Sequence, residues 1–288
     1  MRNETFPIQV RGSLPDTQLI TYIQDYYEEI GIERRPLVLI CPGGAYAYTS
    51  PREGEAIAMQ FLAMGCHAAV LKYSCAPARY PVALTELAAA MALIREHTSD
   101  WHVEPEGLIV LGCSAGGHLA ASMGMLWKES FLAKAVGIAE KDQRLLRPDG
   151  MILCYPVITG GEYAHRGSFE NLLGQEEGKE ERLKDGGSLL SRLSLETRVT
   201  ADTPPAFIWH TFMDGSVPVE NSLLLVSALR RAGVSAEFHM YPEGGHGLSL
   251  ANRLTRHRDG SAVQKECTSW ISLVRTWIES RYIKDDDV

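Results

Sequence analysis

The chain has 288 residues, of which 45% are hydrophobic and 22% are charged, and its formal net charge at pH 7 is -8. This length predicts a single domain over residues 1–288 with a well-filled core, although two small domains would also fit. The acidic balance argues against nucleic acid or an anionic membrane as a partner, because phosphate contacts need clustered Lys and Arg.

The N-terminus and the cysteines indicate where the protein works. The first seven residues contain no apolar segment of a secretory signal, and no stretch approaches the length of a membrane span. Six cysteines lie mostly in apolar runs, without a C-x-x-C pair or metal-ligand spacing. We therefore expect a cytoplasmic protein whose cysteines are reduced and packed in the core.

From about residue 36 onward, short apolar runs alternate with helical patterns. The runs cover residues 37–41, 68–73, 108–111, 151–155, 206–209 and 236–241. Residues 84–97 and 221–232 carry apolar side chains at helical spacing, and Gly233 ends the second pattern. This alternation predicts an α/β fold, with a mostly parallel sheet between two layers of helices.

The sequence Gly112-Cys113-Ser114-Ala115-Gly116 follows the third apolar run and precedes a helical pattern. A serine between glycines at a strand-to-helix turn is typical of a nucleophile elbow, where larger flanking side chains would collide with neighbouring backbone. The following helix directs unpaired backbone N–H groups towards an oxyanion formed at Ser114. Ser114 is therefore the candidate nucleophile.

Residues 160–198 form a long polar segment between the fourth and fifth runs. The sequence favours a solvated surface helix with loops. The alternative is a small cap over the site, since long insertions in compact domains are often functional.

A serine hydroxyl needs a base, and that base needs an acid to orient it. Asp214 follows the fifth run, and His246 lies among glycines after the sixth. Carboxyl ends of parallel strands meet at one edge of a sheet, where α/β proteins place their ligands. The sequence therefore predicts a triad of Ser114, His246 and Asp214.

Other residues compete for these roles. His118 lies within the helix after the elbow and His210 near the end of a strand, and we expect both to pack in or beside the core. Glu243, in the same loop as His246, is the alternative acid. Asp202 precedes its strand and therefore falls at the wrong end of the sheet.

The small residues that follow the first run supply the second half of an oxyanion hole. Backbone N–H groups of this glycine loop can approach a tetrahedral oxygen from the side opposite the elbow. We assign the donors to Gly44 and Ala45, joined by Ala115.

Five segments together resemble a known family. They are PGGAY at 42–46, YSCAP at 73–77, GCSAGGHLA at 112–120, HTFMD at 210–214 with VP at 217–218, and PEGGHG at 242–247. The chain resembles, over about residues 36–280, the α/β-hydrolase esterases known as acetyl-xylan esterases or xylanase-B-like lipase/esterases, which are related to the hormone-sensitive-lipase group. The resemblance implies the α/β-hydrolase fold and the same triad. Pro42 stands where lipase-like relatives carry histidine, and Ala45 where they often carry a third glycine.

The resemblance also implies an activity: hydrolysis of small acyl esters through an acyl-enzyme, with acetylated xylo-oligosaccharides or other sugars as substrates. It implies no metal and no organic cofactor, and a small-molecule ester as partner, while a homo-oligomer stays open. One alternative is a peptidase similar to prolyl oligopeptidase, which normally carries a propeller domain. Another is a non-catalytic binding protein on the same fold, which we expect to have lost His246.

Overall fold

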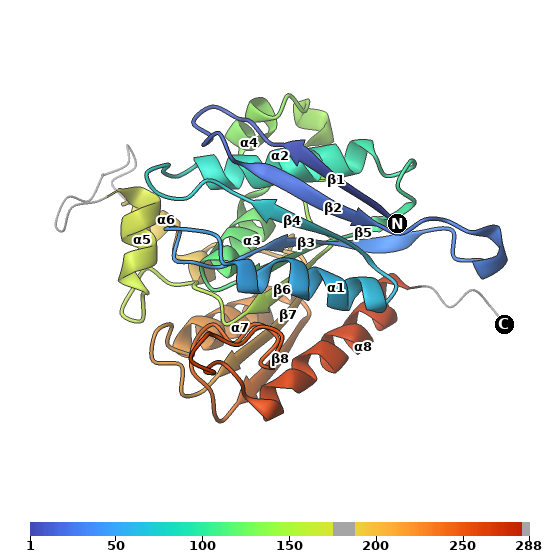
Figure 1. Ribbon diagram of the computed structural model, residues 1–288. Coiled ribbons are helices and arrows are strands. Elements are labelled where there is room, and N and C mark those ends of the chain that lie inside the picture. Colours follow the sequence, from blue (N-terminus) through green and yellow to red (C-terminus); the bar gives the residue numbers. More distant parts are fainter. Residues whose placement is uncertain (175–187, 284–288) are drawn as a thin grey trace.

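The structure is a computed structural model that describes residues 1–174 and 188–283. Its centre is an eight-stranded sheet in the order β1-β2-β4-β3-β5-β6-β7-β8 (Figure 1). The strands are β1 (Arg2–Pro7), β2 (Gln18–Ile23), β3 (Arg35–Cys41), β4 (His67–Lys72), β5 (Val103–Cys113), β6 (Gly150–Cys154), β7 (Ala206–Thr211) and β8 (Ala236–Tyr241). The strands from β3 to β8 pair in parallel, which confirms the predicted mostly parallel sheet. β1 and β2, which fall outside the predicted strands, pair antiparallel with each other, and β2 also pairs antiparallel with β4.

Helices cover both faces of the sheet. They are α1 (Glu55–Ala63), α2 (Val82–Glu96), α3 (Ala115–Leu126), α4 (Ser130–Ala135), α5 (Arg166–Leu173), α6 (Leu189–Arg192), α7 (Glu220–Ala232) and α8 (Trp270–Tyr282). Short 3-10 helices are η1 (Glu28–Ile30), η2 (Pro51–Glu53), η3 (Glu140–Leu146), η4 (Leu195–Thr197) and η5 (Lys265–Ser269). α1 and α8 pack on one face, while α2, α3 and α7 pack on the other (Figure 1). The three layers are those of an α/β-hydrolase fold.

The alternation of side chains along β3 explains the two cores. Leu37, Leu39 and Cys41 belong to the cluster under α2, α3 and α7, whereas Val38 and Ile40 belong to the cluster under α1 and α8. Successive side chains of a strand point to opposite faces. A strand that is buried on both faces therefore reads as a continuous apolar run, which is why the sequence revealed it.

The predicted polar segment at 160–198 contains α5, α6 and η4. Its most acidic part, within 175–187, lies outside the described residues. α5 and α6 lie at the end of the molecule towards which the parallel strands run (Figure 1). The division of the chain into one domain with an insertion stays a prediction.

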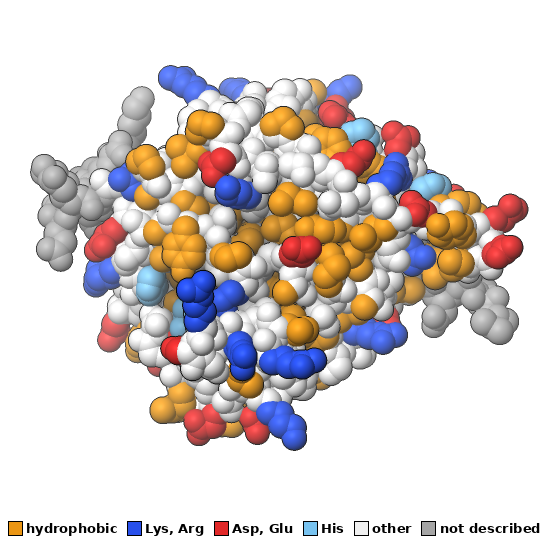
Figure 2. Space-filling view, in the orientation of Figure 1, with side chains coloured by type: hydrophobic (Ala, Val, Ile, Leu, Met, Phe, Trp, Pro, Cys, Tyr) orange, Lys and Arg blue, Asp and Glu red, His pale blue; other side chains and the backbone are white. Residues whose placement is uncertain are grey.

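Figure 2 shows the face on which α1 and α8 lie. Hydrophobic side chains gather over its middle, and Lys and Arg side chains lie mainly below them. Met59 of α1 is 36% exposed. None of the helices in the described ranges is long and apolar enough to span a membrane.

Candidate active site

Ser114 stands at a sharp turn between β5 and α3. Its φ of 53° and ψ of -118° are unusual for a residue with a side chain, and they turn the chain from strand to helix within one residue. A Cβ atom on Gly112 would lie 2.1 Å from the carbonyl oxygen of Gly116, and one on Gly116 would lie 2.0 Å from the carbonyl oxygen of Cys41. Both positions therefore need glycine, as the elbow pattern predicts.

The side chains of Ser114, His246 and Asp214 form a hydrogen-bonded chain. Oγ of Ser114 lies 2.7 Å from Nε2 of His246, and Nδ1 of His246 lies 2.7 Å from Oδ2 of Asp214. An ionised carboxylate only accepts hydrogen bonds, so Nδ1 donates to Asp214 and Nε2 is left to accept the serine hydroxyl. The three residues follow β5, β8 and β7 at their carboxyl ends, so the sheet brings together residues that are 132 and 32 positions apart.

Asp214 accepts hydrogen bonds from three donors, and a nitrogen of His210 lies close to it. Its Oδ1 accepts hydrogen bonds from the backbone N–H groups of Ser216 and Val217, each at 2.9 Å. Oδ2 accepts the hydrogen bond from His246, and Nε2 of His210 lies 3.3 Å from this oxygen and 3.0 Å from the carbonyl oxygen of Val217. Burial alone would raise the pKa of Asp214, but the nearby His210 and the hydrogen bond from His246 outweigh it and hold that pKa well below its ordinary value. The carboxylate is therefore ionised at neutral pH.

The glycine loop after β3 contains neighbouring residues with positive φ. Gly44 has a φ of 129° and Ala45 a φ of 55°, so a non-glycine residue occupies a left-handed position here. The N–H groups of Gly44, Ala45 and Ala115 donate to no acceptor in residues 1–174 or 188–283. Nδ2 of Asn171, on α5, donates to the carbonyl oxygen of Ala45 at 2.9 Å and fixes the loop from outside. These three N–H groups thus stay available to a ligand.

Two residues outside the predicted set support the triad. The ring of Tyr155 meets the imidazole of His246 edge-on, with centroids 5.2 Å apart. Its hydroxyl donates to Oε1 of Glu53 at 2.6 Å and accepts from the backbone N–H of Ser249 at 2.9 Å. The sequence held one weak signal for each of them. Glu53 is an acidic residue just before an apolar helix, and Tyr155 lies at the end of a predicted strand.

Among the competing residues, His210 lies against Asp214, whereas the side chains of His118 and Glu243 make no hydrogen bond to a triad residue. His118 is buried, with its ring nitrogens 2.9 Å from the hydroxyl of Tyr46 and 3.0 Å from the carbonyl oxygen of Leu193. Burial lowers the pKa of His118 to about 4, so the ring is neutral at pH 7. The side chain of Glu243 is exposed, and Asp214 holds the hydrogen bond to Nδ1 of His246.

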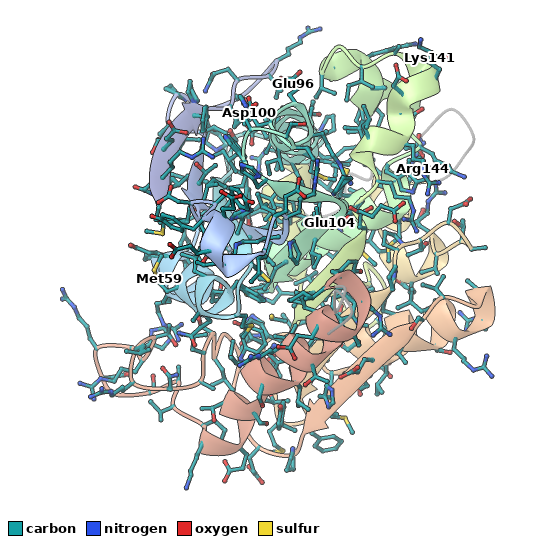
Figure 3. All side chains as sticks on the ribbon, turned by 90° about the vertical axis from the view of Figure 1, so that its right-hand side faces the viewer. Met59, Glu96, Asp100, Glu104, Lys141 and Arg144 are labelled. Carbon is teal, nitrogen blue, oxygen red and sulfur yellow. The ribbon has the colours of Figure 1, made fainter. Side chains whose placement is uncertain are left out.

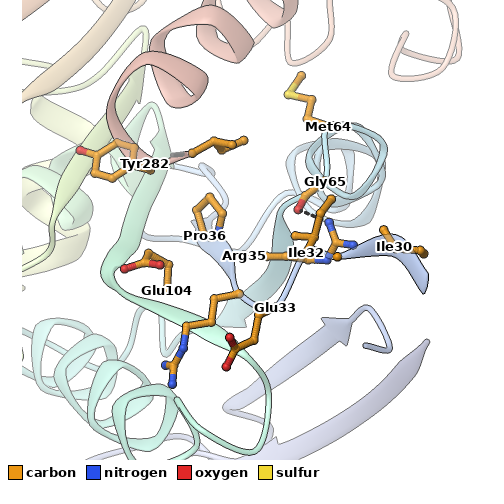
Figure 4. A pocket seen from close by; sticks show the side chains of 12 residues that line it. Ile30, Ile32, Glu33, Arg35, Pro36, Met64, Gly65, Glu104 and Tyr282 are labelled. Atoms are coloured by element: carbon orange, nitrogen blue, oxygen red, sulfur yellow. Dashed lines mark hydrogen bonds between the residues drawn. The ribbon is translucent and has the colours of Figure 1, made fainter. Parts of the chain in front are cut away.

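A separate pocket of about 510 Å³ opens at the other end of the sheet (Figure 4). Arg35 and Pro36, where β3 begins, line it together with Glu104 and Tyr282. It lies roughly 20 Å from the triad, the length of β3. Charged side chains such as Glu104 and Arg144 occupy this end of the molecule (Figure 3).

Within the described ranges, no group of three or more His, Cys, Asp or Glu side chains is arranged to hold a metal ion.

Comparison with known proteins adds a family. The sequence model of the family BD-FAE matches residues 25–229. The chain is 35% identical over 227 residues to endo-1,4-beta-xylanase B of Butyrivibrio fibrisolvens, covering 76% of this chain and 33% of that protein. It is 28% identical over 220 residues to the acetylxylan esterase of Xylanibacter ruminicola, covering 75% of this chain and 42% of that protein. The chain thus spans less than half the length of either relative.

Solved structures give matches over nearly the whole chain. The acetyl ester-xyloside bifunctional hydrolase of Caldicellulosiruptor lactoaceticus has a TM-score of 0.77 and 33% identity, covering 93% of this chain and 89% of that one. The carboxylesterase Cest-2923 of Lactobacillus plantarum has a TM-score of 0.80 and 27% identity, covering all of both chains.

Proposed function

The chain belongs to the BD-FAE family, and from this premise we propose that it is a serine carboxylesterase acting on small acyl esters, above all acetyl esters of sugars. The observation that carries the proposal is the hydrogen-bonded chain from Ser114 through His246 to Asp214. A non-catalytic binding protein would have no need of a base 2.7 Å from a serine hydroxyl. The names of the relatives supply the substrate class, since they include an acetylxylan esterase and an acetyl ester-xyloside hydrolase.

The reaction begins with the serine. Oγ of Ser114 attacks the ester carbonyl carbon while its proton passes to Nε2 of His246, and the carbonyl oxygen becomes an oxyanion. The N–H groups of Gly44, Ala45 and Ala115 stabilise that charge. Ionised Asp214 offsets the positive charge that His246 acquires.

The acyl-enzyme then forms and breaks down. The bond from the carbonyl carbon to the alcohol oxygen breaks, and the alcohol leaves with the proton from His246. Water attacks the acetyl group on Ser114, gives a proton to His246, and releases acetate as the serine recovers its hydrogen. Apart from the ester and water, each of these steps uses only groups of the chain.

α5, which lies within the predicted insertion at 160–198, contacts the oxyanion loop. Nδ2 of Asn171 donates a hydrogen bond to the carbonyl oxygen of Ala45. We include α5 in the proposal as one wall of the substrate site. A cytoplasmic location also belongs to the proposal, because all six cysteines are free and buried, as expected in a reducing compartment.

A labelling and product assay tests the proposal. Wild type should react with a fluorophosphonate probe at Ser114, and should release acetate from p-nitrophenyl acetate and from acetylated xylobiose. Ser114→Ala should lose both labelling and turnover, with kcat reduced by about 10⁴-fold or more. Ser122→Ala, which changes a buried serine further along α3, is the matched control and should keep both.

Two results would contradict the proposal. A Ser114→Ala variant that keeps a tenth of wild-type turnover would show that Ser114 is not the nucleophile. Activity on p-nitrophenyl acetate without acetate release from acetylated xylobiose would exclude sugar esters as the substrate class and indicate a general esterase.

A further inference from the structure

Glu53 is a buried carboxylate that the proposed reaction does not use. It is 3% exposed, at the end of η2, and no Lys, Arg or His of the described ranges lies within ion-pair distance of it. Burying a carboxylate costs free energy that neutral donors offset only in part. We propose that Glu53 is a positioning residue that holds the oxyanion loop against Ser114, an inference that rests on the proposed esterase function.

The first contact of Glu53 is with the oxyanion loop itself. Its Oε2 accepts a hydrogen bond from the backbone N–H of Gly43 at 2.8 Å. A Cβ atom on Gly43 would lie 2.7 Å from this oxygen and 2.9 Å from Cβ of Ser114. Gly43 is therefore wedged between the carboxylate and the nucleophile. Gly44 and Ala45, with their free N–H groups, come directly after it.

The second contact leads to the base. Oε1 of Glu53 accepts from the hydroxyl of Tyr155 at 2.6 Å, and that hydroxyl accepts from the backbone N–H of Ser249 at 2.9 Å. Oγ of Ser249 donates to the carbonyl oxygen of Arg52 at 2.7 Å. Because Arg52 directly precedes Glu53, this bond closes the ring. This closed ring of hydrogen bonds connects η2, the end of β6 and the loop that carries His246.

One side chain thus fixes both halves of the site relative to each other. One carboxylate oxygen accepts from the N–H of Gly43, and the other accepts from the hydroxyl of Tyr155, whose ring contacts His246. Oxyanion donors act only when they lie at hydrogen-bond distance from the oxygen of the transition state, and small displacements are costly. Because the oxyanion is absent from the bound substrate, a displaced loop lowers kcat and leaves KM nearly unchanged.

The substitution Glu53→Gln is a sharp test. An amide has the same shape, but it presents N–H to one of the two donors, so it cannot accept from both. Tyr155→Phe breaks the same ring from its other side and leaves Glu53 in place. For both variants we would measure kcat and KM on p-nitrophenyl acetate, together with inhibition by an alkyl trifluoromethyl ketone.

The ketone reports on the oxyanion loop directly. Oγ of Ser114 adds to its carbonyl carbon, the serine proton passes to His246, and the ketone oxygen becomes an oxyanion in the hole. For Glu53→Gln we expect kcat to fall about 10- to 100-fold and KM to change less than about threefold. The affinity for the ketone should fall by the same factor as kcat, and Tyr155→Phe should show the same pattern at smaller amplitude.

Glu86→Gln is the matched control. Glu86 is also fully buried, and its Oε2 accepts from the backbone N–H of Ser74 at 2.7 Å, on the other side of the sheet. We expect this variant to lower the melting temperature while kcat and ketone affinity stay within about twofold of wild type.

A folded Glu53→Gln variant with kcat within threefold of wild type overturns the inference. Losses of kcat without a matching loss of ketone affinity, or equal losses in Glu86→Gln, also overturn it. If Glu53→Gln does not fold, Tyr155→Phe decides by the same criteria. A wild type that cleaves no ester and is not labelled at Ser114 overturns the proposed function as well, whereas an active wild type with an unaffected variant overturns this inference alone.

Discussion

Nε2 of His210 lies 3.3 Å from Oδ2 of Asp214, the oxygen that also accepts the hydrogen bond from His246. His210 is fully buried, and its Nδ1 lies 2.8 Å from Oγ of Ser222. Two histidines therefore lie against the carboxylate, and only His246 contacts Ser114. Nε2 of His210 also lies 3.0 Å from the carbonyl oxygen of Val217, in the loop that carries Asp214.

Replacing His210 with Phe should lower kcat about tenfold, because the loop of Asp214 loses the buried bond at the carbonyl oxygen of Val217 and the polar contact with the carboxylate, which can then shift. His210→Gln keeps a donor on the side chain and should retain more activity than His210→Phe. Steady-state kinetics on p-nitrophenyl acetate, with melting temperatures for both variants, checks this. Wild-type kcat in a folded His210→Phe variant would contradict it.

Asp214→Asn should lower kcat by about 10⁴-fold, because an amide can hold His246 in the tautomer that cannot accept the serine proton. Glu243→Gln is the matched control, since Glu243 is exposed in the loop of His246 and should be dispensable. Both are measured by the same ester assay. The reverse ranking would transfer the role of the acid to Glu243.

Gly116→Ala should prevent stable folding, or cost about 3 kcal/mol or more of unfolding free energy, because overpacking against rigid backbone cannot relax. The added Cβ would lie 2.0 Å from the carbonyl oxygen of Cys41. Gly215→Ala is the control, because a Cβ there meets no atom within 4 Å. Thermal unfolding of the two variants should separate them, and equal melting temperatures would refute the steric argument.

kcat/KM should fall as the acyl chain lengthens, from acetate through butyrate to octanoate. Each methylene that fits an apolar pocket can gain about 1 kcal/mol of transition-state binding, so a roomy site would give the opposite order. The acyl group must pass between the elbow and the tightly packed loop at Gly43 and Gly44. Rates on the three p-nitrophenyl esters under identical conditions decide between a deacetylase and a lipase-like esterase.

Stability should fall as the pH drops below about 6.5, in part through His118. Burial lowers the pKa of this ring to about 4, so between those values the unfolded chain binds a proton that the folded chain does not. The stability that this group contributes is present above pH 6.5 and is lost as the pH falls towards 4, up to about 3 kcal/mol. Urea unfolding at pH 7 and 4.5 should show a smaller difference for His118→Gln than for wild type. Equal differences would count against His118 as the titrating group.

Local signals in the sequence were sufficient for much of the fold. Apolar runs such as residues 108–111 predicted the central strands, because strands buried on both faces contain few polar residues. The N-terminal strand β1 gave no such signal, since its residues are mostly exposed and its place is set by pairing with β2. The position of β1 in the sheet therefore depends on its pairing with β2 and could not be predicted from its own residues.

The same division applies to the candidate site. The glycines around Ser114 predicted the elbow, because this pattern is local: a Cβ on Gly112 would collide with Gly116, four residues away. The collision of a Cβ on Gly116 with Cys41 depends on the neighbouring strand and is seen only in the structure. Glu53 could not be found in this way, because its partners lie 10 and 102 positions away and meet only after the sheet has formed. The catalytic roles of Ser114, His246 and Asp214 stay predictions until the variants are measured.

Cys113, directly before Ser114, shares the burial of all six thiols. Burial raises the pKa of the Cys113 thiol well above its ordinary value, so the thiolate that reacts with alkylating agents and peroxides is scarcely formed at neutral pH. A sulfur atom thus lies one residue from the proposed nucleophile and has little reactivity of its own. The proposed esterase activity should therefore withstand peroxide and iodoacetamide at doses that inactivate cysteine hydrolases.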